Sequence, residues 1–181
     1  GWYYPDETGI HDYYEQEFID YVNSKTAFSK QLNPNLKTLI APYGTNHVKT
    51  DEKFVEQLKN LDVDFVAYQD EVGVKKSSVD ETSSYYKQLK KAHDLANKSK
   101  LWADVEIFDF EGDVYKSALL PSNIERIKKQ LEAVSPYVEE VLVFQYQGMM
   151  NRPSSISHCG HPDAIKFYKE YKKLVDESKK N

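Results

Sequence analysis

The chain has 181 residues, of which 40% are hydrophobic, and this is enough apolar material for one domain with a substantial core. Its 24 Lys and Arg residues against 29 Asp and Glu give a net charge of −5, and no basic run alternates with aromatic residues, which argues against DNA or RNA as a partner. No stretch approaches the roughly 20 apolar residues of a membrane span. We therefore expect a single domain over residues 1–181.

Five short segments rich in β-branched and aromatic residues predict strands. They are residues 2–5, 36–43, 63–69, 101–108 and 139–146. Helical runs separate them, and no neighbouring pair carries a hairpin signal. This alternation of strand and helix is typical of a parallel α/β sheet.

The helices are predicted from apolar residues three to four positions apart. In the second connection, Thr50 is a candidate N-cap before an acidic first turn. In the fourth, Ser122 followed by Glu125 forms a capping-box pattern. The last helix is expected over residues 163–178.

The strand spacing suits a (β/α)8 barrel of about 31 residues per unit with some enlarged loops. A barrel needs eight units, so this reading makes the chain the C-terminal five-eighths, with the first three units missing. An open doubly wound sheet explains the length without missing units and stays the alternative. No Gly-rich phosphate loop follows any strand, so we expect no nucleotide or other cofactor.

Polar side chains, often beside an aromatic ring, gather where the predicted strands end. In parallel α/β folds, ligands bind beyond the carboxyl ends of the strands. Paired donors and acceptors beside aromatic faces are typical of a carbohydrate site, so a carbohydrate is the expected ligand. The candidates are Glu7, Tyr43, Asn46, Tyr68, Gln69, Asp70, Trp102, Asp104, Glu106 and Gln145.

The run "LWADVEI" at residues 101–107 places two carboxylates in a predicted strand. Side chains alternate between the faces of a strand, so Trp102, Asp104 and Glu106 share one face and the apolar residues between them share the other. The plainer alternative is that the two carboxylates pair with cations and tie structural layers together.

A metal site is not expected. His158 and His161 lie three apart around Cys159, with no matching second pair of ligands nearby. Cys159 is the only cysteine, so an intrachain disulfide is impossible.

The motifs "GWYYPDE", "APYG", "YQDEVGV", "LWADVEIF" and "VLVFQYQGMMNRP", in this order, resemble an uncharacterised bacterial family of (β/α)8 proteins similar to glycoside hydrolases, the domain of unknown function 4434. The resemblance covers residue 1 to about residue 175 and corresponds to the C-terminal part of the family's domain. It implies cleavage of O-glycosidic bonds by two carboxylates. We also expect an extracellular or cell-envelope location, although the N-terminus has neither the basic start nor the apolar core of a signal peptide.

By the same resemblance, the five strands are the fourth to eighth of a barrel. Many retaining glycosidases of this fold place the acid/base after strand four and the nucleophile at the end of strand seven, which are the positions of Glu7 and Glu106. Those enzymes usually carry Asn-Glu after strand four, whereas this chain has Asp6-Glu7. Tyr68 and Trp102 are then candidates for stacking on the sugar. The hydroxyl partners are Gln69, Asp70, Asn46 and Gln145.

Two alternatives remain open. The same lining suits a non-catalytic carbohydrate-binding domain. The second alternative is that the chain is an inactive fragment, which self-associates or needs the missing N-terminal part of the barrel. The reason is that an incomplete barrel exposes strand edges and an apolar inner face.

Overall fold

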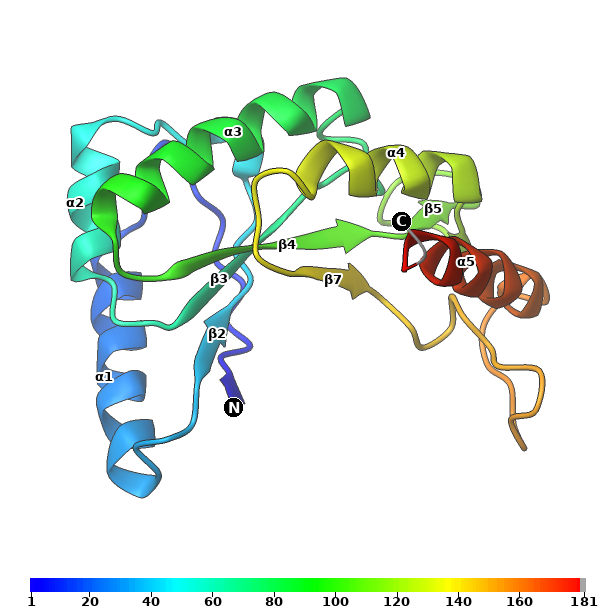
Figure 1. The fold of residues 1–181 in the computed structure, drawn as a ribbon, viewed down its shortest axis with the longest axis horizontal. Helices are drawn as coiled ribbons and strands as arrows, with labels where there is room; N and C mark the ends of the chain where they lie inside the picture. Colours follow the sequence, from blue (N-terminus) through cyan, green and yellow to red (C-terminus); the bar gives the residue numbers. More distant parts are fainter. Residues whose placement is uncertain (180–181) are drawn as a thin grey trace.

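The computed structural model describes residues 1–179, which form a curled parallel sheet covered by helices (Figure 1). The strands are β1 (Trp2–Tyr3), β2 (Thr38–Ile40), β3 (Phe65–Gln69), β4 (Lys100–Glu106) and β7 (Val141–Phe144). They lie side by side in chain order, and each is parallel to its neighbour. A doubly wound sheet reverses its strand order at a switch point, whereas a barrel does not. The structure is therefore a segment of a (β/α) barrel, and the alternative of a doubly wound sheet is wrong.

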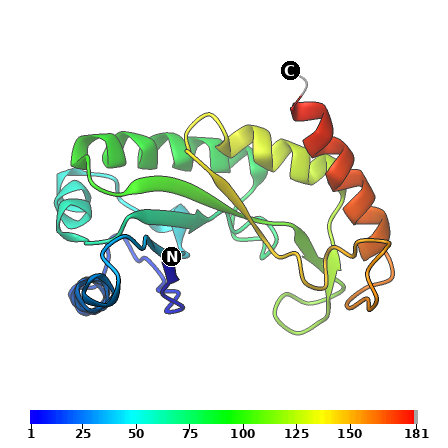
Figure 2. The same cartoon turned by 60° about the horizontal axis from the view of Figure 1, so that its bottom comes forward.

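The helices follow the curve of the sheet on one side and leave the other face open (Figures 1 and 2). They are α1 (Gln16–Leu32), α2 (Glu52–Asn60), α3 (Val79–Ala96), α4 (Ile124–Val134) and α5 (Ala164–Ser178), with a short 3-10 helix at Thr45–His47. In residues 1–179 no helix combines the length and the apolar character that crossing a membrane requires.

The core lies between the sheet and the helices. On β4, Leu101, Ala103 and Val105 are buried, whereas Trp102 and Asp104 are only half-buried. The predicted alternation along this strand is therefore confirmed. On the open face, the ring of Trp102 stacks on that of Phe65 with 4.2 Å between centroids.

A two-stranded antiparallel hairpin leaves the sheet between β4 and α4, formed by β5 (Phe108–Phe110) and β6 (Leu119–Pro121). The sequence carries no hairpin signal here, and this hairpin was not among the predicted elements. The tip is not a two-residue Asn-Gly type of turn, which is the strongest short-range hairpin signal. Instead, Ser117 Oγ accepts from the Gly112 N–H at 2.8 Å and donates to the Asp113 carbonyl at 3.0 Å, so one side chain stabilises a longer turn.

Two predicted helix starts differ from the structure. The N-cap of α2 is Asp51, whose Oδ1 accepts from the Phe54 N–H at 3.2 Å. The N-cap of α4 is Asn123, whose Oδ1 accepts from the Glu125 N–H at 2.7 Å, whereas Ser122 Oγ accepts from Nε of Arg126 at 2.5 Å. A reciprocal capping box is present on α3, between Ser78 and Glu81.

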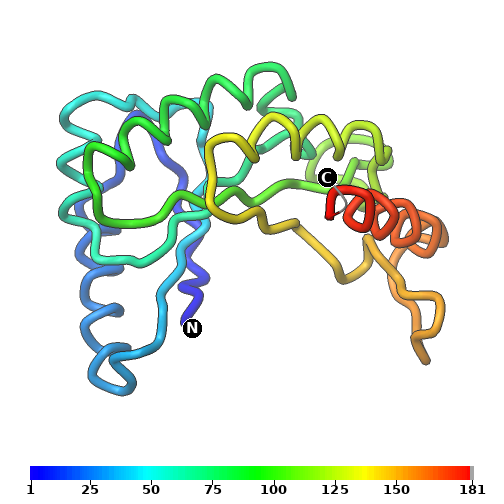
Figure 3. Tube along the Cα trace, viewed as in Figure 1, coloured from blue at the N-terminus to red at the C-terminus, as the bar shows by residue number. Residues whose placement is uncertain are grey.

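The chain leaves β7 through a cis peptide bond between Phe144 and Gln145 and enters a long loop over residues 145–163, which extends away from the sheet before α5 (Figure 3). The Asn151 side chain holds this loop together. Its Nδ2 donates to the Cys159 carbonyl at 2.7 Å, and its Oδ1 accepts from the Cys159 N–H at 3.3 Å.

Candidate active site

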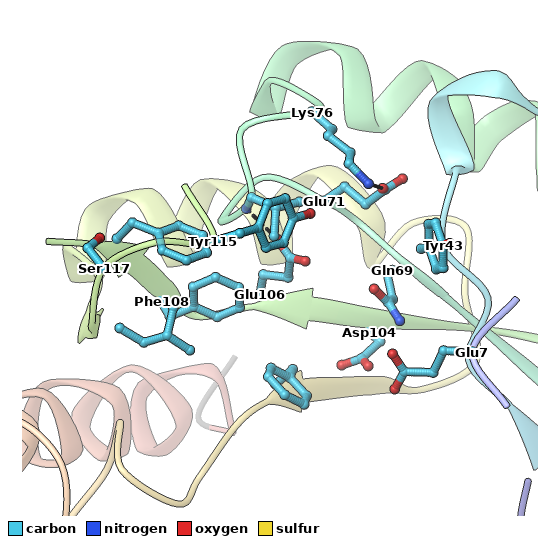
Figure 4. Close-up of a pocket in the computed structure, with 14 residues that line it drawn as sticks. Glu7, Tyr43, Gln69, Glu71, Lys76, Asp104, Glu106, Phe108, Tyr115 and Ser117 are labelled. Atoms are coloured by element: carbon cyan, nitrogen blue, oxygen red, sulfur yellow. Dashed lines mark hydrogen bonds and ion pairs between the residues drawn. The ribbon is translucent and has the colours of Figure 1, made fainter. Parts of the chain in front are cut away.

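A pocket of about 730 Å³ opens at the carboxyl ends of the strands (Figure 4). Its walls come from the segments after β1 and β2, the ends of β3 and β4, the 70–76 loop, the hairpin and the end of β7. Half of the predicted site residues line it, namely Glu7, Tyr43, Gln69, Asp104 and Glu106.

Glu106 is the last residue of β4 and lies between the two halves of the pocket (Figure 4). The residue is only 4% exposed, and its Oε2 accepts a hydrogen bond from the Val74 N–H at 2.8 Å. Burial, followed by the negative charge of Asp70, raises the pKa of Glu106 to about 8. A carboxyl group with this pKa carries its proton at neutral pH.

The 70–74 loop brings its backbone against Glu106 because residue 73 is glycine. A Cβ added to Gly73 would lie 2.8 Å from the Phe108 carbonyl oxygen and 3.0 Å from Glu106 Oε2. Any side chain at this position would force the loop or the carboxyl group to move. The glycine thus allows the Val74 N–H to reach Glu106.

Asp70 stabilises the carboxyl end of β4 through hydrogen bonds to Glu106 and its neighbours. Its Oδ1 accepts the N–H groups of Glu106 (3.0 Å) and Val72 (3.3 Å). Its Oδ2 accepts from Nε2 of Gln130 at 2.5 Å, and this amide also donates to the Glu106 carbonyl at 3.2 Å. Asp70 is 1% exposed, so the prediction that it binds substrate hydroxyls is wrong. Its carboxylate is occupied by holding β4, the loop and α4 together.

Asp104 and Glu7 point toward each other across the end of the pocket opposite the hairpin (Figure 4). Burial, then Asp70, then Glu7 raise the pKa of Asp104 to about 7. Glu7 is exposed, and its Oε1 accepts a hydrogen bond from the Tyr3 hydroxyl at 2.9 Å. The carboxyl group of Asp104, on β4, is therefore electrostatically coupled to that of Glu7, in the segment after β1.

Glu71 and Lys76 also line the pocket and were not predicted. Glu71 Oε2 accepts from the N–H groups of Gly44 (2.8 Å) and Thr45 (2.9 Å), at the start of the 3-10 helix. Lys76 Nζ lies 3.2 Å from Glu71 Oε1 and 4.9 Å from the centroid of the Tyr43 ring. Adjacency to Asp70 in "YQDEVG" was the available signal for Glu71, whereas nothing in the sequence pointed to Lys76.

The other end of the pocket is aromatic. Phe108 makes edge-to-face contacts with Phe110 and Phe144, at 5.7 and 6.1 Å between centroids, and Phe110 contacts Tyr115 at 5.6 Å. Every second residue from 104 to 110 lines the pocket, so the alternation of β4 continues into β5. That continuing alternation is the sequence signal that would have found Phe108 and Phe110.

The comparison with protein families identifies the relatives of this chain. The model of a domain of unknown function, DUF4434, matches residues 1–157. The chain belongs to the DUF4434 family. A search of the curated proteins finds no match.

A solved structure shares the fold of this DUF4434 chain. It is a crystal structure from Bacteroides thetaiotaomicron described as that of a "putative alpha-L-fucosidase", with a TM-score of 0.77 and 20% identity. The alignment covers 97% of this chain and 56% of that chain, so this chain spans little more than half the length of its neighbour.

The remaining predicted residues of the DUF4434 chain lie outside the pocket. Tyr68 points toward the helices and is fully buried, so the prediction that it stacks on a sugar is wrong. Its hydroxyl accepts from the Tyr14 hydroxyl at 3.1 Å and lies 3.1 Å from His93 Nε2, and its carbonyl accepts from the Tyr86 hydroxyl. Tyr68 is therefore part of a buried polar network behind the sheet.

Trp102, Asn46 and Gln145 are also absent from the pocket lining. Trp102 lies on the open face against Phe65, and the Asn46 side chain donates to the Lys76 carbonyl at 3.2 Å. Gln145 is half-buried after the cis bond. Their roles in binding a ligand stay predictions.

Among residues 1–179, no group of three or more His, Cys, Asp and Glu side chains is arranged to hold a metal ion. His161 lies 3.5 Å from Asp163 at the start of α5, and Cys159 is exposed.

Proposed function

We propose that this protein hydrolyses O-glycosidic bonds, with Glu106 and Glu7 as the reacting carboxyl groups. One observation carries the proposal. Carboxyl groups from two different strand ends, β1 and β4, line a single pocket at the ligand end of a parallel sheet, and one of them, Glu106, has a pKa raised to about 8. A glycosidase needs such a carboxylic acid together with a second carboxylate.

The raised pKa favours Glu106 as the proton donor. The resemblance to retaining glycosidases had suggested that Glu106 is the nucleophile, and a nucleophile has to be ionised. Burial and the charge of Asp70 both disfavour the ionised form. The Val74 N–H orients the carboxyl group by binding Oε2, which leaves Oε1 for the proton that is transferred.

The reaction then proceeds as follows. Glu106 donates its proton to the glycosidic oxygen, the bond between the anomeric carbon and that oxygen breaks, and the leaving group departs as an alcohol. Glu7 is oriented by the Tyr3 hydroxyl. It either takes a proton from the water that attacks the anomeric carbon, or attacks that carbon itself; in the second case the ionised Glu106 takes a proton from the water that then breaks the bond between the sugar and Glu7. Asp104, Gln69 and Tyr43 line the same end and supply hydrogen-bond partners for sugar hydroxyls.

Two comparisons support this reading. The family model covers most of the chain. The motifs on which the resemblance rests supply Glu106 and the polar end of the pocket, whereas most of the aromatic end comes from the hairpin, outside those motifs. The structural neighbour is described as a "putative alpha-L-fucosidase", so α-L-fucosides belong among the first substrates to be tried.

The test is a screen of 4-nitrophenyl glycosides, including the α-L-fucoside, followed by Glu106→Gln and Glu7→Gln variants on any substrate that is cleaved. We expect each substitution to lower kcat/KM by roughly 10²–10⁴-fold, and Glu17→Gln, an exposed change on α1, to leave it unchanged. NMR of the first anomer released tells retention from inversion. Full activity in Glu106→Gln would overturn the proposal. Glycan binding without any hydrolysis would instead support the non-catalytic binding domain.

A further inference from the structure

The pocket is divided chemically into two ends, with Glu106 between them (Figure 4). One end carries Glu7, Tyr43, Gln69 and Asp104, which offer donors and acceptors. The other carries Phe108, Phe110, Leu119 and Phe144, which offer none. The polar side chains beside the apolar end are those of Tyr115, Ser117 and Lys76. Ser117 Oγ is already used within the hairpin turn, and Lys76, which interacts with Tyr115, is paired with Glu71 at 3.2 Å.

A sugar is a poor occupant of the apolar end. Each ring hydroxyl taken out of water needs a hydrogen-bond partner, and an unpaired one costs free energy. The aromatic rings there meet one another edge to face and form a wall from two elements, the hairpin and the end of β7. Phe144 and Tyr115 are 40% and 66% exposed, so this wall has apolar surface left to cover.

We propose that the substrate is a glycoside with an apolar, preferably aromatic, aglycone. This inference rests on the proposed function: the sugar occupies the polar end, the scissile oxygen lies at Glu106, and the aglycone packs against Phe110, Tyr115 and Phe144. An aromatic ring against this wall gains both burial of apolar area and edge-to-face contacts. The hairpin is then the element that determines specificity, since it supplies most of the apolar end.

Calorimetry on the Glu106→Gln protein tests the inference without interference from hydrolysis. The probes are paired methyl and phenyl glycosides in the α-L-fuco, β-D-gluco and β-D-galacto series. We expect the phenyl member to bind roughly tenfold or more tightly than its methyl partner in the series that binds. Equal affinities, or no binding of any phenyl glycoside at millimolar concentration, would overturn the inference.

Variants of the wall identify where the aglycone binds. In the same background, Tyr115→Ser and Phe110→Ala should remove most of the difference between phenyl and methyl glycosides and leave methyl binding unchanged. Tyr115 is exposed, so Tyr115→Ser tests the wall even if Phe110→Ala fails to fold. The control is Phe28→Ala, an equally exposed aromatic residue on α1, outside the pocket. A phenyl preference that survives both wall variants contradicts the assignment.

The two proposals fail in different ways. If phenyl glycosides bind at the wall and no glycoside is hydrolysed, then the proposed function is wrong and the apolar subsite remains. If glycosides are hydrolysed but disaccharides and phenyl glycosides have the same kcat/KM, then the inference about the aglycone is wrong.

Discussion

Asp70 accepts a hydrogen bond from the backbone N–H of Glu106, with 3.0 Å between the nitrogen and Oδ1. This contact ties a fully buried carboxylate to the residue proposed to donate the proton. Asp70 holds the end of β4 in place, and its negative charge adds to the effect of burial, which is the larger cause of the raised pKa of Glu106. Position and protonation state of Glu106 therefore depend on the same side chain.

Replacement of Asp70 by asparagine removes the charge and keeps the contact with the Glu106 N–H, while its amide nitrogen takes the place of the oxygen that accepts from Gln130. The removed charge is one of the causes of the raised pKa of Glu106. If protonated Glu106 is the acid, kcat/KM of the native protein falls as pH rises through about 8. In Asp70→Asn this alkaline limb should move to lower pH. Asp20→Asn, an exposed change on α1, should not move it. An unchanged limb in Asp70→Asn would show that Asp70 has no influence on the acid.

Gly73→Ala tests the close approach of the 70–74 loop to Glu106. The new methyl group would overlap the Phe108 carbonyl and the Glu106 carboxyl group, so we expect a loss of about 1–3 kcal/mol in the free energy of unfolding and a large loss of activity. Gly112→Ala is the control, because its added Cβ would lie 3.5 Å from Ser117 Cβ, an ordinary contact. Denaturant unfolding measures both variants. Equal stability of the two would contradict the predicted overlap.

Tyr68→Phe tests the corrected role of Tyr68. Removal of the hydroxyl leaves Tyr14 and His93 without this buried partner, and we expect a cost of roughly 1–3 kcal/mol in the free energy of unfolding. Because Tyr68 faces the helices, KM should stay the same. A raised KM with unchanged stability would contradict this structural role and indicate that Tyr68 contacts the substrate.

His93 makes the fold sensitive to acid. Burial lowers the pKa of His93 from 6.5 to about 4. Between pH 6.5 and about 4, His93 is therefore mostly protonated in the unfolded chain and mostly neutral in the folded protein. The stability present above pH 6.5 is thus lost progressively as the pH falls to about 4, by on the order of 3 kcal/mol. Thermal unfolding of His93→Gln should show a smaller loss over this range than the native protein.

The exposed His158 provides the control for this pH dependence. His158→Gln should lose stability with falling pH as the native protein does. If His93→Gln and His158→Gln behave alike, then His93 is not the cause of the acid sensitivity.

The amino-acid pattern predicted β4 well and β3 poorly, for the same physical reason. Alternation places Asp104 and Glu106 on one face, and both line the pocket. On β3, Tyr68 and Gln69 are consecutive, so they point to opposite faces and only one of them can reach the ligand. Tyr68 is buried behind the sheet and Gln69 lines the pocket.

Other features had no readable local signal. The hairpin turn depends on a Ser side chain and not on a Gly or Asn pair, so the hairpin and the part of the pocket formed by Tyr115 and Leu119 went unpredicted. The contact between Asp70 and Gln130 joins residues far apart in the chain, and only the packing of α4 against the sheet brings them together. Lys76 lies in the pocket with its Nζ 4.9 Å from the centroid of the Tyr43 ring, a contact between residues far apart in the chain.

The dependence of the Glu106→Gln variant on the leaving group tests the central claim most directly. A 2,4-dinitrophenyl glycoside needs little help from an acid, whereas an unsubstituted phenyl glycoside needs a proton on its oxygen. If Glu106 is the proton donor, Glu106→Gln should lose roughly 10²–10⁴-fold in kcat/KM on the phenyl glycoside and far less on the dinitrophenyl glycoside. An equally large loss on both substrates would contradict this role and indicate that Glu106 is the nucleophile.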